Sequence, residues 1–286
     1  NIFQYNTFFE SEGALTLRHG NRATVRGNFF FGNDKPNTGG VRIIGEDHKV
    51  YNNYFDGLRG TGNRSTITLM NGVSDSPLNR YFQVKRAEVS HNTIVNCYQP
   101  FLIGGGSNEE LSLPPLDCVI ANNVVSTDNG YVIFNLDDDP INLSYNSNIV
   151  WGSSLGIPEN TDGVTVINPQ LDIAEDSLWR PETGSPLIDS ATGSYDYIIN
   201  DMDGQTRVGS FDIGADQMSS DSIEVRPLTG SDVGPDWLNL VDLPAFIVTS
   251  SNGMGTVTLD PDTNIFVNGD TVIISAIPDP GWTFSE

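Results

Sequence analysis

Two short segments near the start of the chain combine apolar alternation with a single arginine each. Residues 15–20 read LTLRHG, and residues 39–45 read GGVRIIG. Alternating apolar and polar side chains predict half-buried strands, which would place Arg18 and Arg42 on the outer face. A guanidinium can hold a carboxylate with two hydrogen bonds, so stacked strands that present arginines suit an anionic ligand.

The charge distribution supports local capture of an anion. Residues 1–86 contain 11 of the 14 lysines and arginines and seven acids, so this segment carries +4 in a chain of net charge -23. A basic region on an acidic protein concentrates anions at one place. Nucleic acid is a disfavoured partner, because no RNP, zinc-finger or helix-turn-helix pattern is found. The sequence contains no run of 18 apolar residues that would predict a membrane span.

An internal repeat predicts how these strands are stacked. Six triplets share the form Asn, small or apolar, apolar, and they begin at Asn6, Asn28, Asn53, Asn92, Asn123 and Asn148. Asparagine tolerates left-handed backbone geometry at corners, and stacked amides can bond one another along an axis. A period of 22 to 25 residues indicates a solenoid, with insertions in the two wider gaps. The missing leucine lattice favours an all-β, right-handed parallel β-helix over leucine-rich repeats.

Changes in repeat pattern and composition along the chain predict a β-helix, a linker and a small C-terminal module. Residues 1–218 are expected to form the β-helix, whose closing segment (179–217) is expected to cap the open end of the stack. Residues 219–245 are rich in Ser, Asp, Pro and Gly and are expected to form a linker. Residues 246–286 resemble part of the β-repeat modules that follow secreted or surface bacterial enzymes. Cys97 and Cys118 are interpreted as small buried apolar residues.

The first 100 residues resemble polysaccharide lyase family 6, which contains alginate lyases and chondroitinase B. Six ordered segments carry the resemblance: residues 6–8, 13–20, 40–45, 69–72, 79–84 and 92–97. It implies β-elimination on a uronic-acid polymer. The acidic composition and the appended module favour alginate as the substrate and a secreted, cell-surface or periplasmic bacterial location. This chemistry needs a neutralised uronate carboxylate, a base for the C5 proton, and positive charge or a proton at the leaving oxygen.

The resemblance assigns Arg18 as the catalytic acid, and the chemistry of its neighbour His19 also suits proton transfer. A guanidinium rarely releases a proton, since its pKa lies above about 12, so we describe Arg18 as stabilising charge on the leaving oxygen. His19 carries protons more readily. Consecutive strand residues point to opposite faces, so His19 can face the same groove only if the strand bends at Gly20.

Four further residues are expected to bind the substrate. Arg42 is predicted to hold a uronate carboxylate, and Arg64, Arg80 and Tyr81 are predicted to extend the subsites, with the Tyr81 ring available for sugar stacking.

Two components of the family are expected upstream of Asn1, where the chain begins in the middle of a repeat. They are the lysine that acts as base, about one coil before Arg18, and the acidic and amide ligands of a calcium ion. We assign no metal ligand in this chain, and Glu10 and Glu12 do not receive that role.

Three alternatives remain open. The first is a non-catalytic polysaccharide-binding or adhesion β-helix, and the second is a chondroitin or dermatan lyase. The third is a hydrolase that uses residues 137–139, three consecutive aspartates, in the manner of polygalacturonases. The competing interpretation of these aspartates is an exposed turn before Pro140.

Overall fold

A computed structural model describes residues 1–13, 15–128, 130–234, 245–249, 253–266 and 270–283. It divides into two compact units, Asn1–Pro227 and Leu228–Glu286. The helical element of the described part is one 3-10 turn, η1 (Gly62–Arg64). Within these residues, no helix has the length and apolarity needed to cross a membrane.

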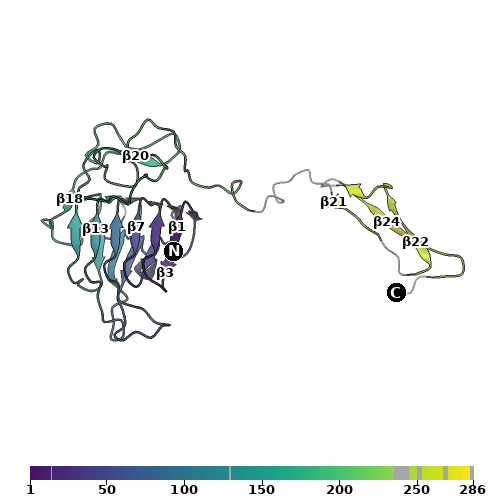
Figure 1. Ribbon diagram of the computed structural model, residues 1–286, viewed down its shortest axis with the longest axis horizontal. Helices are drawn as coiled ribbons and strands as arrows, with labels where there is room; N and C mark the ends of the chain where they lie inside the picture. Colours follow the sequence, from purple (N-terminus) through teal and green to yellow (C-terminus); the bar gives the residue numbers. More distant parts are fainter. Residues whose placement is uncertain (14, 129, 235–244, 250–252, 267–269, 284–286) are drawn as a thin grey trace. The chain divides into compact units, whose positions relative to one another are not determined.

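The first unit is a stack of coils in which three sheets run side by side (Figure 1). The first sheet contains β1 (Ile2–Gln4), β4 (Thr24–Arg26), β7 (Lys49–Tyr51), β10 (Glu88–Ser90), β13 (Val119–Ala121) and β16 (Ser144–Asn146). The second contains β2 (Thr7–Phe9), β5 (Phe29–Phe31), β8 (Tyr54–Asp56), β11 (Thr93–Val95), β14 (Val124–Ser126), β17 (Asn148–Trp151) and β18 (Val164–Val166). The third contains β3 (Leu15–Leu17), β6 (Val41–Ile43), β9 (Ile67–Met70), β12 (Phe101–Gly105) and β15 (Phe134–Leu136). Neighbouring strands are parallel and come from successive coils, which confirms the predicted parallel β-helix.

The repeated asparagines form a buried ladder between the first and second sheets. From Asn28 onward, each side-chain oxygen accepts hydrogen bonds from the backbone and side-chain nitrogens of the previous ladder residue, at 2.9 to 3.1 Å. The predicted amide stacking is therefore confirmed. The ladder asparagines themselves were expected to have left-handed backbone geometry, and this was wrong by one residue. The positive φ belongs to the residue before each ladder position, as at Asn52 (53°), His91 (51°) and Asn122 (53°).

The interior of the stack is filled by inward side chains from all three sheets. Phe8, Phe30 and Phe55 lie on successive coils with parallel rings, and their centroids are 4.4 and 4.6 Å apart. Cys97 and Cys118 are buried free thiols, and burial raises their pKa values to about 12 and about 11. Such thiols are inert, so their interpretation as small apolar residues is confirmed.

The segment after β18 covers the outer flank of the second sheet (Figure 1, around β20). It contains the antiparallel strands β19 (Leu171–Ile173) and β20 (Trp179–Pro181). Two apolar clusters join it to the stack: Leu178, Met202 and Ala215 with Phe29, Tyr54 and Val95, and Leu187 and Ile213 with Val124 and Ile149. The expectation of a cap on the open end was wrong. The second sheet has apolar residues on both faces, so its outer face also needs a cover.

The second unit is built from antiparallel pairs. β21 (Ala245–Phe246) pairs with β23 (Ile265–Phe266), and β22 (Gly255–Asp260) pairs with β24 (Ile273–Pro278). The predicted linker, residues 219–245, includes residues 235–244, which lie outside the described part. Its first residues lie with the first unit, since the Glu224 and Val225 amides donate to the Asp203 carbonyl at 2.9 and 2.8 Å.

Candidate active site

Arg18 lies just beyond β3 and is held by a loop from another coil. Its Nη2 donates to the Asn79 carbonyl at 2.9 Å, and its guanidinium lies over the Tyr81 ring, 5.2 Å from the centroid. Asn79 and Tyr81 belong to the long connection between β9 and β10, which we name loop 71–87. The structure thus brings together Arg18 and Tyr81, two of the predicted site residues, and keeps the guanidinium charge without a carboxylate partner among the described residues.

Arg42 and Arg64 line one pocket. Arg42 is the middle residue of β6, between Thr16 of β3 and Thr68 of β9 in register. Arg64 ends η1 and donates from Nη1 to Asn37 Oδ1 at 3.2 Å. Together with Glu12, Gly13, Thr61 and Asn63 they surround a volume of about 500 Å³.

The Arg42 side chain is unusual in its hydrogen bonding. Its Nε is buried and has no hydrogen-bond partner among the described residues. A buried guanidinium donor without an acceptor is costly. Arg42 also lines the pocket, where its guanidinium would meet a ligand carboxylate. The exposed Glu12 lies in the same lining, so the pocket holds two cations and one anion.

His19 is exposed beside Arg18, because β3 ends at Leu17 and neither residue is part of the strand. Gly20 follows with φ +88°, which provides the predicted bend. The His19 side chain makes no hydrogen bond or ion pair within the described residues. Because Arg18 and His19 lie outside the strand, the rule that consecutive strand residues point to opposite faces does not apply to them.

Arg80 does not join the pocket of Arg42 and Arg64. Its Nε donates to Glu110 Oε1 at 2.8 Å, and its Nη2 binds Glu110 Oε2. Glu110 belongs to the connection between β12 and β13, named loop 106–118. Sequence reasoning missed Glu110, because a contact between two insertions has no periodic signal. Substrate binding by Arg80 stays a prediction.

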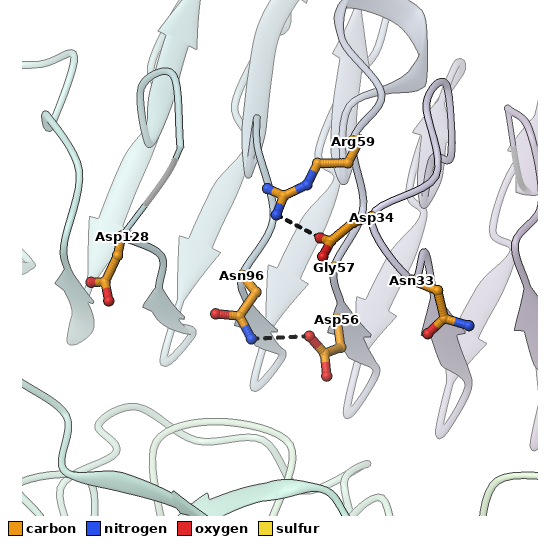
Figure 2. Close-up of a pocket in the computed structure, with 7 residues that line it drawn as sticks. All are labelled: Asn33, Asp34, Asp56, Gly57, Arg59, Asn96 and Asp128. Atoms are coloured by element: carbon orange, nitrogen blue, oxygen red, sulfur yellow. Dashed lines mark hydrogen bonds and ion pairs between the residues drawn. The ribbon is translucent and has the colours of Figure 1, made fainter.

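A second pocket of about 320 Å³ lies at the corner after the second-sheet strands (Figure 2). Its lining is Asn33, Asp34, Asp56, Gly57, Arg59, Asn96 and Asp128. Arg59 pairs with Asp34 at 2.5 Å, and Asn96 donates to Asp56 at 3.2 Å (Figure 2). Burial raises the pKa of Asp56. The acidic lining makes this corner unsuited to a polyanion, in contrast to the Arg42 pocket.

The acidic cluster of the flanking segment does not fit a calcium ion. One group of three acids has its oxygens close together, Asp201, Asp203 and Asp216. Arg180 pairs with Asp203 at 2.5 Å and with Asp216 at 3.1 Å. The Asp201 carboxylate accepts three backbone N–H bonds at 2.9 to 3.0 Å. Since these oxygens are already occupied, the cluster fixes the flanking segment, and calcium with upstream ligands stays a prediction.

Two of the three consecutive aspartates bond to the starts of loops 71–87 and 106–118. Asp138 Oδ2 accepts from Asn71 Nδ2 at 2.7 Å and from Ser107 Oγ at 3.2 Å, and Asp137 accepts from the Gly106 amide at 3.3 Å. These bonds favour a structural role over the acid and base work of a hydrolase.

Comparison with known proteins defines the family. A family model described as chondroitinase B matches residues 1–189. The chain is similar to a solved PL6 family alginate lyase, AlyGC, with 35% identity and a TM-score of 0.58 over 64% of this chain and 25% of that chain. A mutant of AlyGC is 28% identical, with a TM-score of 0.63 over 89% of this chain and 29% of that chain. No curated protein matches.

The fold also matches the alginate lyase AlyF-OU02, at 24% identity and a TM-score of 0.54, over 64% of this chain and 43% of that chain. The chain spans about a quarter of the length of AlyGC. The family model covers well over half of the chain, and the parallel coils agree with it. This chain therefore belongs to the chondroitinase B family, within polysaccharide lyase family 6.

Proposed function

We propose that this protein is a polysaccharide lyase that cleaves a uronic-acid polymer by β-elimination, with alginate as the substrate. The observation that carries the proposal is the pocket in which Arg42, with its unpartnered buried Nε, lies beside Arg64. Two guanidinium groups that pair with no carboxylate of the described residues suit a uronate carboxylate. The similarity to AlyGC, described as an alginate lyase, supports alginate as the polymer.

Two groups of residues would serve two different parts of the reaction. Arg42 and Arg64 would neutralise the uronate carboxylate, which acidifies the C5 proton. Removal of that proton leaves an electron pair that forms the C4–C5 double bond while the C4–O bond breaks. Arg18 would stabilise the negative charge on the departing oxygen, and His19 can carry the proton that this oxygen takes up. We assign the base to no described residue, and it stays expected before Asn1.

Binding by residues 1–286 tests the pocket without requiring turnover. Isothermal titration with saturated oligouronates should give at least tenfold weaker affinity for Arg42→Ala, because the variant loses a bidentate carboxylate contact. Arg59→Ala is the matched control: it removes the same charge from the acidic corner of Figure 2 and should bind as the wild type does. Equal affinity for the wild type and Arg42→Ala would exclude this pocket as the carboxylate site.

Turnover is tested on the longest protein that contains this chain. Absorbance of the unsaturated uronate product should rise on addition of alginate. No new absorbance on any uronate polymer would reject the lyase. Oligouronate binding without absorbance would favour the non-catalytic alternative.

A chondroitin or dermatan lyase is the second candidate, because the matching family model is described as chondroitinase B. Parallel assays with alginate, chondroitin sulfate and dermatan sulfate distinguish the two by the relative kcat/KM. A polymer substrate of this kind is met outside the cytoplasm, so a secreted or cell-surface location belongs to the same proposal.

A further inference from the structure

Two insertions follow neighbouring strands of the third sheet and pack against each other. Loop 71–87 follows β9 and loop 106–118 follows β12. Gly72 and Leu113 exchange backbone hydrogen bonds at 2.7 and 2.9 Å. Gln83 Nε2 donates to the Pro114 carbonyl at 2.7 Å. The bases of the two loops are thus joined, so the position of one loop depends on the other.

The outer parts of the loops are joined by a charged pair. Arg80 and Glu110 meet in a bidentate arrangement, and the two side chains are 38% and 53% exposed. The turn that presents Glu110 is fixed by Asn108, whose Oδ1 accepts the Glu110 and Leu111 amides at 2.8 and 2.9 Å. The carboxylate therefore has a defined direction before it meets the guanidinium.

Arg80 lies between the two residues that contact Arg18. Asn79 supplies the carbonyl that accepts from Arg18, and Tyr81 supplies the ring beneath the guanidinium. The Tyr81 carbonyl also accepts from the Val73 amide at 2.9 Å, which closes the loop on itself. An anchor on Arg80 consequently fixes both of its neighbours against Arg18.

We propose that Glu110 is a positioning residue for the reaction: through Arg80 it holds residues 79–81 against Arg18 and so sets the direction of the Arg18 guanidinium. The inference rests on the proposed function, in which Arg18 faces the leaving oxygen. It also gives Arg80 a role in the loop rather than in the substrate subsite. Bidentate pairing gives this contact a defined geometry, although exposure limits its strength.

Kinetics of the full-length enzyme test the proposal. Glu110→Gln should lower kcat about fivefold and leave KM nearly unchanged, since an exposed pair contributes little and acts here on the transition state. Glu109→Gln removes the same charge from the adjacent residue, which makes no side-chain bond within the described residues, and should behave as the wild type. The exchanged pair Arg80→Glu with Glu110→Arg should recover most of the lost kcat.

The opposite pattern would overturn the proposal. If Arg80 binds substrate directly, Glu110→Gln frees its guanidinium and KM falls, while the exchanged pair stays impaired because it places a carboxylate near the polyanion.

Hydrogen exchange on residues 1–286 without substrate separates this inference from the proposed function. Amides of residues 73–83 should exchange faster in Glu110→Gln than in the wild type and in Glu109→Gln, and the exchanged pair should restore protection. Unchanged exchange would reject the loop anchor whatever the activity. Faster exchange together with an inactive wild type would reject the lyase and, with it, the positioning role, while leaving the Arg80–Glu110 contact itself supported.

Discussion

The arginines of this chain differ in what neutralises them. Arg59 and Arg86 pair with carboxylates, and the Arg86 contact lowers the pKa values of Glu46 and Asp47. Arg18 instead meets a carbonyl and a ring, and the buried Arg42 Nε meets nothing in the described residues. A guanidinium without an internal counter-ion remains available to a uronate, which favours Arg18 and Arg42 as substrate contacts.

Tyr81 is expected to act through its ring face rather than its hydroxyl. Tyr81→Phe keeps the surface beneath Arg18 and should retain kcat within about twofold, whereas Tyr81→Ala should lower kcat about fivefold, the size of an exposed cation–π contact. Steady-state rates of the full-length enzyme check this. A loss in Tyr81→Phe equal to that in Tyr81→Ala would point to the hydroxyl instead.

The asparagine ladder makes a prediction about stability. Asn92→Ala should lower the free energy of unfolding by about 3 kcal/mol, because Asn53 loses its side-chain acceptor and the Val50 carbonyl loses a donor inside the stack. Chemical denaturation of residues 1–286 measures this. Asn146→Ala is the control, since that side chain is exposed and makes no hydrogen bond in the described residues. Similar losses in both variants would contradict the ladder's importance.

At the scale of elements, the repeat was predictable and the insertions were not. One ladder asparagine marks each coil, so the sequence alone indicates where strands of the second sheet begin. The pairing of Arg80 with Glu110 depends on how two aperiodic loops fold against each other, and no local pattern encodes it. The flanking position of residues 171–217 also required the structure, because an apolar segment can cover an end or a side equally well.

His91 should make the attachment of the flanking segment sensitive to pH. Its ring is buried without hydrogen bonds, against Tyr195 and Phe211, with centroids at 4.7 and 6.1 Å. Burial, with a smaller contribution from the Arg207 charge, holds the pKa of His91 well below its usual value. The unfolded chain therefore binds the proton first, and stability is lost as pH falls below about 6.5.

The expected size is a loss of up to about 2 kcal/mol between pH 6.5 and 5, at 1.36 kcal/mol per pH unit. His91→Asn removes the titration and retains a residue that tolerates positive φ. Burial raises the pKa values of Asp201 and Asp216 to about 6, so these two groups add stability as pH falls. Their contribution is the same in the wild type and in His91→Asn and cancels in the comparison. Denaturation curves at both pH values give the difference. Equal pH dependence would mean that His91 does not titrate as described.

Calcium should leave the stability of this chain unchanged. The Asp203 and Asp216 oxygens are bound by Arg180, and the Asp201 oxygens accept backbone amides, so an added ion finds no open ligand set there. Thermal unfolding of residues 1–286 with calcium and with a chelator should give one midpoint. A higher midpoint in calcium would show that residues 1–286 bind the ion and would contradict this prediction.

At the scale of the whole molecule, the boundary between basic and acidic segments does not coincide with the boundary between the two units. The +4 segment, residues 1–86, is part of the first unit, which also contains the acidic flanking segment. Arg18, Arg42 and Arg64 lie in the third sheet or next to it, in the residue after β3, in β6 and in η1. The acids Asp201, Asp203 and Asp216 belong to the segment that covers the second sheet. A polyanion is thus attracted to one side of a protein that otherwise repels it.

Because every candidate site residue lies in the first unit, oligouronate binding should not require the second. A chain of residues 1–227 should bind oligouronates within about twofold of residues 1–286 and show the same unfolding midpoint for its β-helix. Affinity should also fall with added salt by the same factor in both chains, since the arginine contacts and not the second unit supply the attraction. Titration calorimetry at two salt concentrations measures both quantities. A loss of tenfold or more on truncation, or a steeper salt dependence in the longer chain, would assign part of the binding to residues 228–286.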